Sequence, residues 1–498
     1  MFYFDKLKTK KRKSDEVFYD AFYENSNVDK LPKLSQKEHT RLCYNFCTQT
    51  GELITGYGFS DLVLPIDIND ETTRTVWFSD VQRKNLWFFK SYNATSGKFS
   101  YKILCDNQNG NLEMLNVFSP GIFTTEILLE SPFQNSPTGI CYTVNNEDYI
   151  LFSGEEGLYK FTEGEVVKHN AVLPKFVDLC YGYENLFGIV EGKRSYVFYS
   201  LTLDPMQWTV DENVIELTDE RGKCNSLIYF NDYLYVFRDY GITKISKYST
   251  RGEFSVYNLF TSGNKIYGKT VVKCEDDVFF FTRDGLYKFN GSSTDKINLN
   301  INALFKNINN ENAVACFSEN QYILACKLNF NDEQKIGCEN HEDGFVNNAI
   351  IFYDIHKNTF NILRGVDVHS LLALNQENVS TVLATFNKEY KNKIGMLNKN
   401  GEFFGNFLNA EWGSVKTDLG HLELIKNIKE IYIKSQEDCN IKIQTNLEEK
   451  EVKIKGKNKL QKIKTFVKGN EFCVKVCANN QSRISPFKLK IEVVKNEV

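Results

Sequence analysis

The stretch Gly157-Leu158-Tyr159-Lys160-Phe161 recurs unchanged as Gly285-Leu286-Tyr287-Lys288-Phe289, with a looser copy, Gly-Ile-Thr-Lys-Ile, at residues 241–245. Each copy follows a run of strand-forming residues that opens with an acidic or Asn-Asp pair. This pattern predicts a strand, a tight turn and a second strand, repeated along the chain. The outer copies are 128 residues apart and the inner copy divides this distance into 84 and 44. A diverged unit at residues 194–200 fits the larger gap, so the period is about 43 residues.

A period of this length in a strand-rich chain is typical of propeller blades with four strands each. Further blades are expected near residues 140–170, 178–210, 225–255, 268–300, 313–363 and 370–404, after an earlier group of strands that begins near residue 76. Dividing the strand-rich region by the period predicts about seven blades, with six or eight as alternatives. The 14% aromatic content, with 39 Phe and 26 Tyr, agrees with a strand-rich core.

The pattern changes at Trp412. Beyond Lys426, isoleucine and valine alternate with polar positions, many of them lysine. Such alternation predicts short antiparallel strands packed as a small sandwich. The predicted fold class is therefore all-β, a divergent β-propeller followed by a small immunoglobulin-like β-sandwich. The predicted domains are a polar N-terminal arm at 1–40, the propeller at 41–410 and the sandwich at 411–498.

Composition gives few clues to a partner. The 498 residues carry a formal charge of −4, which provides no global attraction to nucleic acid or membrane. No apolar run is long enough to span a bilayer, and the charged N-terminus does not resemble a secretory leader. The 13 cysteines are odd in number and mostly lie in apolar runs, which favours reduced core thiols over disulfides.

No catalytic residue, cofactor-binding residue or metal ligand is predicted, and no cofactor is expected. Cys338 and His341 lie in an acidic insertion at 331–347, but a lone C-x-x-H supplies half a zinc shell, so an exposed hairpin tip is favoured. Whether this insertion binds a metal or a partner is left open. Residues 67–71 resemble the start of a calcium loop without its glycine and distal acid, which favours a solvated turn. A lysine-rich cluster at residues 6–13 is interpreted as a solvated arm rather than an anion-binding surface.

Two acidic pairs occupy the same position in the repeat, Glu147-Asp148 and Asp276-Asp277. Carboxylates from different blades converge in propeller glycosidases, but a recurring turn position favours turn formation or capping. No nucleophile elbow, P-loop or dinucleotide fingerprint is present in a suitable context.

The order of several segments resembles the structural tail proteins of bacteriophages. These segments are the Gly-Glu-Leu-x-x-Gly-Tyr-Gly-Phe stretch at 51–59, read as a tight hairpin, then the propeller, Trp412 with Thr417-Asp418-Leu419-Gly420, and residues 426–433. The resemblance implies a non-enzymatic virion protein of the tail hub or nozzle type, made in the bacterial host cytoplasm. It would form a homo-oligomeric ring around the DNA channel, with tail or portal-proximal proteins as partners and transient, non-specific contact with DNA.

Two alternatives remain. One is a cellular propeller scaffold that binds other proteins, for which Tyr353-Asp354 followed by Thr359-Phe360 gives kelch-like support without the double glycines of that family. The other is a carbohydrate-active enzyme, because propellers commonly host such activities.

Overall fold

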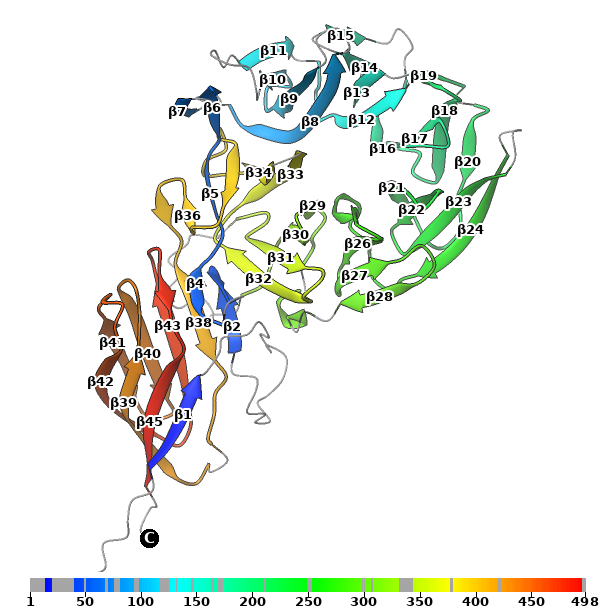
Figure 1. Ribbon diagram of the computed structural model, residues 1–498. Helices are drawn as coiled ribbons and strands as arrows, with labels where there is room; N and C mark the ends of the chain where they lie inside the picture. The colour runs from blue at the N-terminus through cyan, green and yellow to red at the C-terminus, as the bar shows by residue number, and fades with distance from the viewer. Residues whose placement is uncertain are drawn as a thin grey trace, which may run out of the picture.

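The repeated pentapeptides begin equivalent strands of different sheets in the computed structural model: β14 (Gly157–Thr162), β27 (Gly285–Phe289) and, for the looser copy, β23 (Gly241–Tyr248) (Figure 1). The structure describes residues 14–19, 40–48, 51–67, 70–75, 81–93, 98–116, 125–130, 132–144, 147–162, 165–168, 173–209, 211–248, 253–297, 299, 301–305, 308–330, 344–376, 379–419 and 422–494. Within these ranges the regular structure consists of strands and two 3₁₀ helices, η1 (Gly268–Thr270) and η2 (Asn302–Phe305). The predicted all-β class is confirmed.

Seven sheets follow one another along the described chain, which matches the predicted blade count. The first blade consists of β8 (Arg83–Asn93), β9 (Lys98–Asn107), β10 (Leu112–Asn116) and β11 (Thr125–Leu129). The second consists of β12 (Thr138–Val144), β13 (Glu147–Gly154), β14 (Gly157–Thr162) and β15 (Glu165–Lys168). The third consists of β16 (Phe176–Gly182), β17 (Asn185–Val190), β18 (Tyr196–Leu201), β19 (Asp204–Trp208) and β20 (Val214–Glu216). The fourth blade consists of β21 (Cys224–Phe230), β22 (Tyr233–Arg238), β23 (Gly241–Tyr248) and β24 (Glu253–Thr261). The fifth consists of β25 (Val272–Cys274), β26 (Asp277–Thr282), β27 (Gly285–Phe289) and β28 (Thr294–Ile297). The sixth consists of β29 (Val314–Ser318), β30 (Gln321–Cys326), β31 (Ala349–Asp354) and β32 (Thr359–Arg364). The seventh contains β33 (Val368–Gln376), β34 (Val379–Phe386), β35 (Gly395–Asn398) and β5 (Gly58–Asp61).

The blades form a closed ring (Figure 1). The innermost strand of each blade contacts that of the next, and β33 and β34 of the seventh blade contact β8 of the first. Hydrogen bonds within the seventh blade also help to close the ring, because β5, from the N-terminal part of the chain, pairs with β35, from its C-terminal part. Closure of this kind leaves no gap between the first and last blades.

The predicted tight hairpin at residues 51–59 is wrong. β4 (Leu53–Thr55) pairs with β3 (Phe46–Cys47) and β44 (Arg483–Ile484), whereas β5 joins the seventh blade and contacts β36 (Glu402–Phe403). Gly51 lies in the turn before β4, with φ +75° and its N–H bonded to the Thr48 carbonyl, whereas Gly58 allows close backbone approach rather than a turn. A Cβ at Gly58 would lie 2.1 Å from the carbonyl oxygen of Glu402.

The pentapeptide carries a contact between blades. The ring of Phe161 packs edge-on against Phe89 of the preceding blade, with 5.3 Å between centroids. Phe289 makes the equivalent contact with Tyr235 of its preceding blade at 5.0 Å. Edge-to-face aromatic pairs stabilise a fold by more than their buried area alone provides. Packing between neighbouring blades therefore explains why the pentapeptide recurs within this chain.

The second region is a sandwich of two sheets. One has the order β1 (Ser14–Tyr19), β45 (Phe487–Val494), β39 (Ile425–Ile433) and β42 (Gln461–Gly469); the other has β2 (Thr40–Tyr44), β38 (Ala410–Ser414), β43 (Phe472–Ala478), β40 (Cys439–Thr445) and β41 (Glu449–Ile454). Isoleucines and valines fill its core, around the fully buried Trp412. Two strands from the first 44 residues therefore complete sheets whose other members lie beyond residue 409, and the predicted 410/411 boundary falls inside β38.

A buried polar cluster joins the two regions. The Arg364 guanidinium, at the end of β32, lies 3.8 Å from the ring centroid of Phe330 and 4.9 Å from that of Tyr44. The Tyr44 hydroxyl donates to Glu411 Oε2 at 2.9 Å, and Lys475 Nζ lies 3.5 Å from Glu411 Oε1. Burial raises the pKa of Glu411, while Lys475 and the Tyr44 hydroxyl act to lower it. These contacts tie the last strand of the sixth blade to the sandwich.

Two further pairings complete the described strands. β6 (Val63–Asp67) pairs with β7 (Asp70–Thr75), and β36 pairs with β37 (Asn406–Phe407). Burial raises the pKa of the Cys180, Cys224 and Cys316 thiols to about 12, which suits inert core residues.

Candidate functional site

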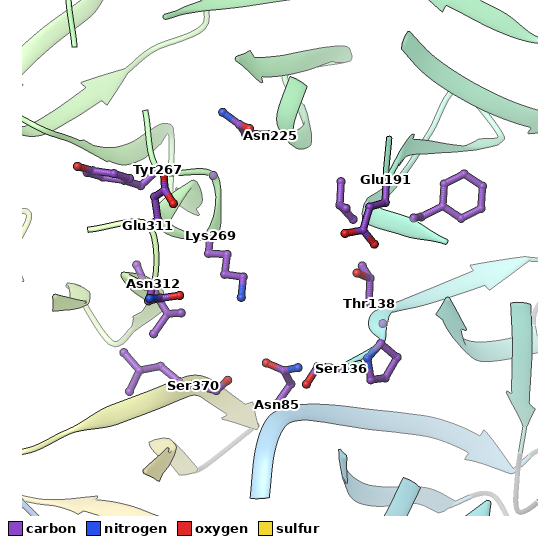
Figure 2. A pocket seen from close by; sticks show the side chains of 18 of the residues that line it. Asn85, Ser136, Thr138, Glu191, Asn225, Tyr267, Lys269, Glu311, Asn312 and Ser370 are labelled. Atoms are coloured by element: carbon purple, nitrogen blue, oxygen red, sulfur yellow. The ribbon is translucent and has the colours of Figure 1, made fainter. Parts of the chain in front are cut away.

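A central channel of about 730 Å³ lies where the seven blades meet. Figure 2 shows side chains from around the whole ring pointing into it. Its polar lining consists mainly of amides, hydroxyls and charged groups, of which Asn85, Ser136, Thr138, Glu191, Asn225, Lys269, Glu311, Asn312 and Ser370 are examples. Residues of β8, β12, β16, β21, β29 and β33 line the channel, together with residues 265–269 before β25, so the fold itself brings these residues together from across nearly 300 positions of sequence.

Three of the six charged side chains that line the channel form ion pairs: Lys175, Lys265 and Glu311. Lys265 Nζ lies 2.6 Å from Glu311 Oε1, and this hydrogen bond raises the pKa of Lys265. Lys175 Nζ lies 2.8 Å from Glu155 Oε1. Partial burial acts to raise the pKa of Glu155, but hydrogen bonds from Lys175 and Asn135 outweigh it and lower the value to about 2. These ion pairs stabilise the channel wall rather than present reactive groups.

Lys269 projects into the open centre of the channel (Figure 2). The surrounding walls lower its pKa by desolvation, whereas Asp106 acts in the opposite direction. Its amine and the surrounding amides and hydroxyls suit an anionic group. Glu191 and Glu311 stand on opposite walls, and Glu311 is bound to Lys265, so the described lining lacks the paired carboxylates of a glycosidase.

The predicted acidic pairs lie at hairpin ends. Asp148 accepts hydrogen bonds from Thr143 Oγ1 at 2.6 Å and from the Tyr92 backbone N–H at 3.1 Å. Asp277 starts β26 and lies 3.8 Å from Lys288 Nζ. Both positions agree with turn formation and capping, and neither points into the channel lining.

Other sequence candidates fall partly outside the described residues. Cys338, His341 and residues 331–343 of the acidic insertion lie outside them, as does the basic cluster at 6–13. The calcium-like segment falls at the β6–β7 hairpin, with residues 68–69 outside the described ranges. In the part of the chain that the structure describes, no three His, Cys, Asp or Glu side chains form a metal-binding group.

Sequence reasoning missed the outer edge of the fourth blade. β24 has nine residues, whereas the outermost strands described in the first, second, third, fifth and sixth blades have three to six. It pairs with β23 on one side, and no described strand pairs with the other. Exposed apolar side chains gather along β24 and at the end of β23: Tyr248, Val256, Tyr257 and Leu259. The run Phe-Ser-Val-Tyr-Asn-Leu-Phe at 254–260 was the available signal.

Solved structures with similarity to this chain include two crystal structures of BBS1N in complex with ARL6DN, one soaked with mercury and one with lead. They are 11% and 10% identical to the chain, with TM-scores of 0.42 and 0.43, and each match covers 68% of this chain and 97% of the other. No protein-family model and no curated protein sequence matches. Among the described helices, none is long and apolar enough to cross a bilayer.

The prediction of a phage tail component is wrong on this comparison. Both structures are complexes of one protein with a protein partner, and neither is described as a virion component. The propeller and sandwich, which do not depend on the resemblance, stand on the observed sheets.

Proposed function

We propose that this chain is a non-catalytic propeller scaffold that binds another protein. The observation that carries the proposal is the open edge of β24, nine residues long and lined by exposed apolar side chains. Tyr248 is 68% exposed and Tyr257 51% exposed. Unpaired backbone groups on a long apolar edge are a template for strand addition, which proteins usually shield with charge or proline.

Pairing with β23 and packing against the neighbouring blade hold β24 in place, which reduces the conformational entropy lost when a peptide binds to it. β24 pairs with β23 in antiparallel fashion through eight residue pairs. Phe254 packs on the neighbouring blade, with ring centroids 4.9 Å from Tyr199 and 5.6 Å from Phe187. An extended peptide added to β24 would gain backbone hydrogen bonds from the open edge and side-chain contacts from Val256, Tyr257 and Leu259.

The test is selection of peptide ligands from a yeast-displayed random library, followed by affinity measurement. We expect selected peptides to alternate apolar and polar residues. The double variant Val256→Lys with Leu259→Lys should weaken their binding at least tenfold, because charges on an edge oppose strand addition. Leu203→Lys, at a 51% exposed apolar site on the third blade, is the matched control and should leave affinity within twofold. Unchanged binding by the double variant would contradict the proposal.

The homo-oligomeric ring expected from sequence is the competing partner arrangement. Light scattering over a wide concentration range distinguishes the two, since self-association gives multiples of 57.6 kDa without an added partner. If β24 pairs with a second copy, the double-lysine variant should return the protein to a monomer.

A further inference from the structure

The charge of the chain is strongly segregated between its two regions. Residues 425–494 hold 15 Lys and one Arg against eight Asp or Glu, a formal charge of +8, although the whole chain carries −4. The rest of the chain therefore carries −12. A basic domain on an acidic protein indicates a local anionic partner that the total charge conceals.

The excess positive charge concentrates on one edge of the sandwich. β41 and β42 are edge strands of the two sheets and lie side by side, on the margin of the sandwich away from the propeller ring (Figure 1). Eight exposed lysines occur between residues 450 and 468, against one glutamate, Glu451. They are Lys450, Lys453, Lys455, Lys457, Lys459, Lys462, Lys464 and Lys468.

Only some of these lysines are engaged within the molecule. Lys462 pairs with Glu430 at 3.0 Å and Lys455 with Asp438 at 3.7 Å, while Lys450 donates to the Thr465 carbonyl. The nearby glutamates are also occupied in part: Glu449 pairs with Lys442 at 2.6 Å, and Glu448 accepts from the Lys468 backbone N–H. Within the described residues, Lys453, Lys457, Lys459 and Lys464 have no carboxylate within ion-pair distance. These four remain available to an external anion.

Exposed apolar side chains stand among these lysines. Leu460 is 70% exposed in the loop that joins β41 to β42, Leu447 is 61% exposed in the β40–β41 turn, and Phe466 is 56% exposed within β42. Phe466 has φ +54° at a point where the register of β42 against β39 shifts. A bulge with a left-handed non-glycine residue re-aims a side chain at an energetic cost, and such features gather at functional sites.

We propose that the β41–β42 edge docks on the surface of an anionic lipid bilayer. Lysines attract acidic headgroups, and Leu447, Leu460 and Phe466 enter the boundary between headgroups and acyl chains. Two leucines and one phenylalanine suit an apolar interface better than a nucleic acid, which is bound by stacking on several aromatic rings or by arginine. The site is distinct from β24, which lies on the opposite side of the molecule (Figure 1).

The test is vesicle co-sedimentation of the full chain with phosphatidylcholine vesicles, with and without about 30% phosphatidylserine. We expect binding to the phosphatidylserine vesicles alone, with affinity that falls as salt rises. Lys457→Glu with Lys459→Glu should weaken it at least tenfold. Phe466→Ser, and separately Leu460→Ser, should weaken it about fivefold while the lysines remain. The Leu460→Ser variant, in the loop between β41 and β42, keeps the test valid if the Phe466→Ser variant fails to fold.

The control is Lys223→Glu combined with Leu203→Ser, two exposed sites on the propeller, which should not change binding. Three results would overturn the proposal: no binding to acidic vesicles, equal loss in the propeller control, or binding that the apolar substitutions leave unchanged. Single-stranded and duplex oligonucleotides form a separate arm. Tighter binding to either of them than to acidic vesicles at the same ionic strength would reassign the edge to nucleic acid.

Discussion

The propeller and the sandwich are both all-β, yet they are stabilised by different side chains. Between blades the contacts are aromatic, as in the pair Phe237 and Phe280, whose centroids are 5.3 Å apart across the fourth and fifth blades. The sandwich core is built largely from Ile and Val, with Trp412 packed edge-on to Phe487 at 5.9 Å. Flat rings fill the wedge between twisted sheets, whereas branched aliphatic side chains interdigitate between two facing sheets.

Their surfaces differ just as clearly. Residues 425–494, which form most of the sandwich, carry +8 and the remainder of the chain carries −12, so opposite charges cover two parts of one molecule. Net charge alone hides this difference, because it averages over both. Where two regions of one chain diverge in this way, partners are better inferred region by region. The four predictions that follow test how independently the regions behave, in order of decreasing effect.

Trp412→Ala should destabilise the sandwich by about 3–5 kcal/mol, because it leaves a large cavity at a fully buried site. Regional hydrogen exchange should show lost protection in β39–β45 while β22 and β23 remain protected. Phe280→Ala, also fully buried, is the reciprocal variant and should reverse the pattern. Equal loss of protection in both regions for either variant would show that they unfold as one unit.

Gly58→Ala should destabilise the propeller by about 1–3 kcal/mol, because the added Cβ meets the backbone of Glu402 rather than a flexible side chain. Thermal unfolding measures the loss, and exchange at β5 should rise first. Gly263→Ala is the matched control, since nothing lies within 4 Å of its added Cβ. A destabilised sandwich with an intact ring would contradict the assigned role of β5 in ring closure.

Asp178 should make propeller stability fall as pH rises from about 4 to 6. Its Oδ2 accepts from the Leu227 N–H at 2.6 Å across the third and fourth blades. Burial raises its pKa from 3.8 to about 6, although hydrogen bonds from Leu227, Ser226 and Leu179 oppose the shift. The unfolded chain therefore releases this proton first, and the folded state loses about 1–3 kcal/mol across the window.

Asp178→Asn should remove that slope in pH-dependent chemical denaturation. Ser226→Ala keeps the carboxyl but removes a donor to it, which raises the pKa further and moves the loss to higher pH. The slope is wrongly assigned if it persists unchanged in the asparagine variant.

Added salt should produce the smallest effect, a gain below about 1 kcal/mol confined to the sandwich. Its lysines repel one another, and salt screens exposed charges over about 10 Å at 0.1 M. Calorimetry in a series of NaCl concentrations should show a rise in the sandwich transition, and Lys464→Gln should reduce it. A larger shift in the propeller would mean that its acidic charge dominates instead.

The sequence alone predicted the blade count and the approximate limits of most blades, but not that the seventh blade includes β5 from residues 58–61. The pentapeptide recurs because blades that share a turn and a contact with a neighbouring blade require similar residues at equivalent positions, and this requirement gives the sequence its period. The alternation after Lys426 likewise predicted the sandwich. Local pattern failed at Gly58 and Phe466, where the backbone follows contacts made by residues far away in the sequence.

The candidate sites needed three dimensions. Lys269 and Asn85 share a channel only because the ring closes, and β24 is an open edge because, among the described strands, only β23 pairs with it. Leu447 and Phe466 become surface residues through a turn and a bulge that hydropathy does not reveal. Periodicity, composition and charge are properties of neighbouring residues and were decided by the sequence itself. Ring closure, exposure and the meeting of distant side chains depend on how the sheets are arranged in space, and only the tertiary structure decided them.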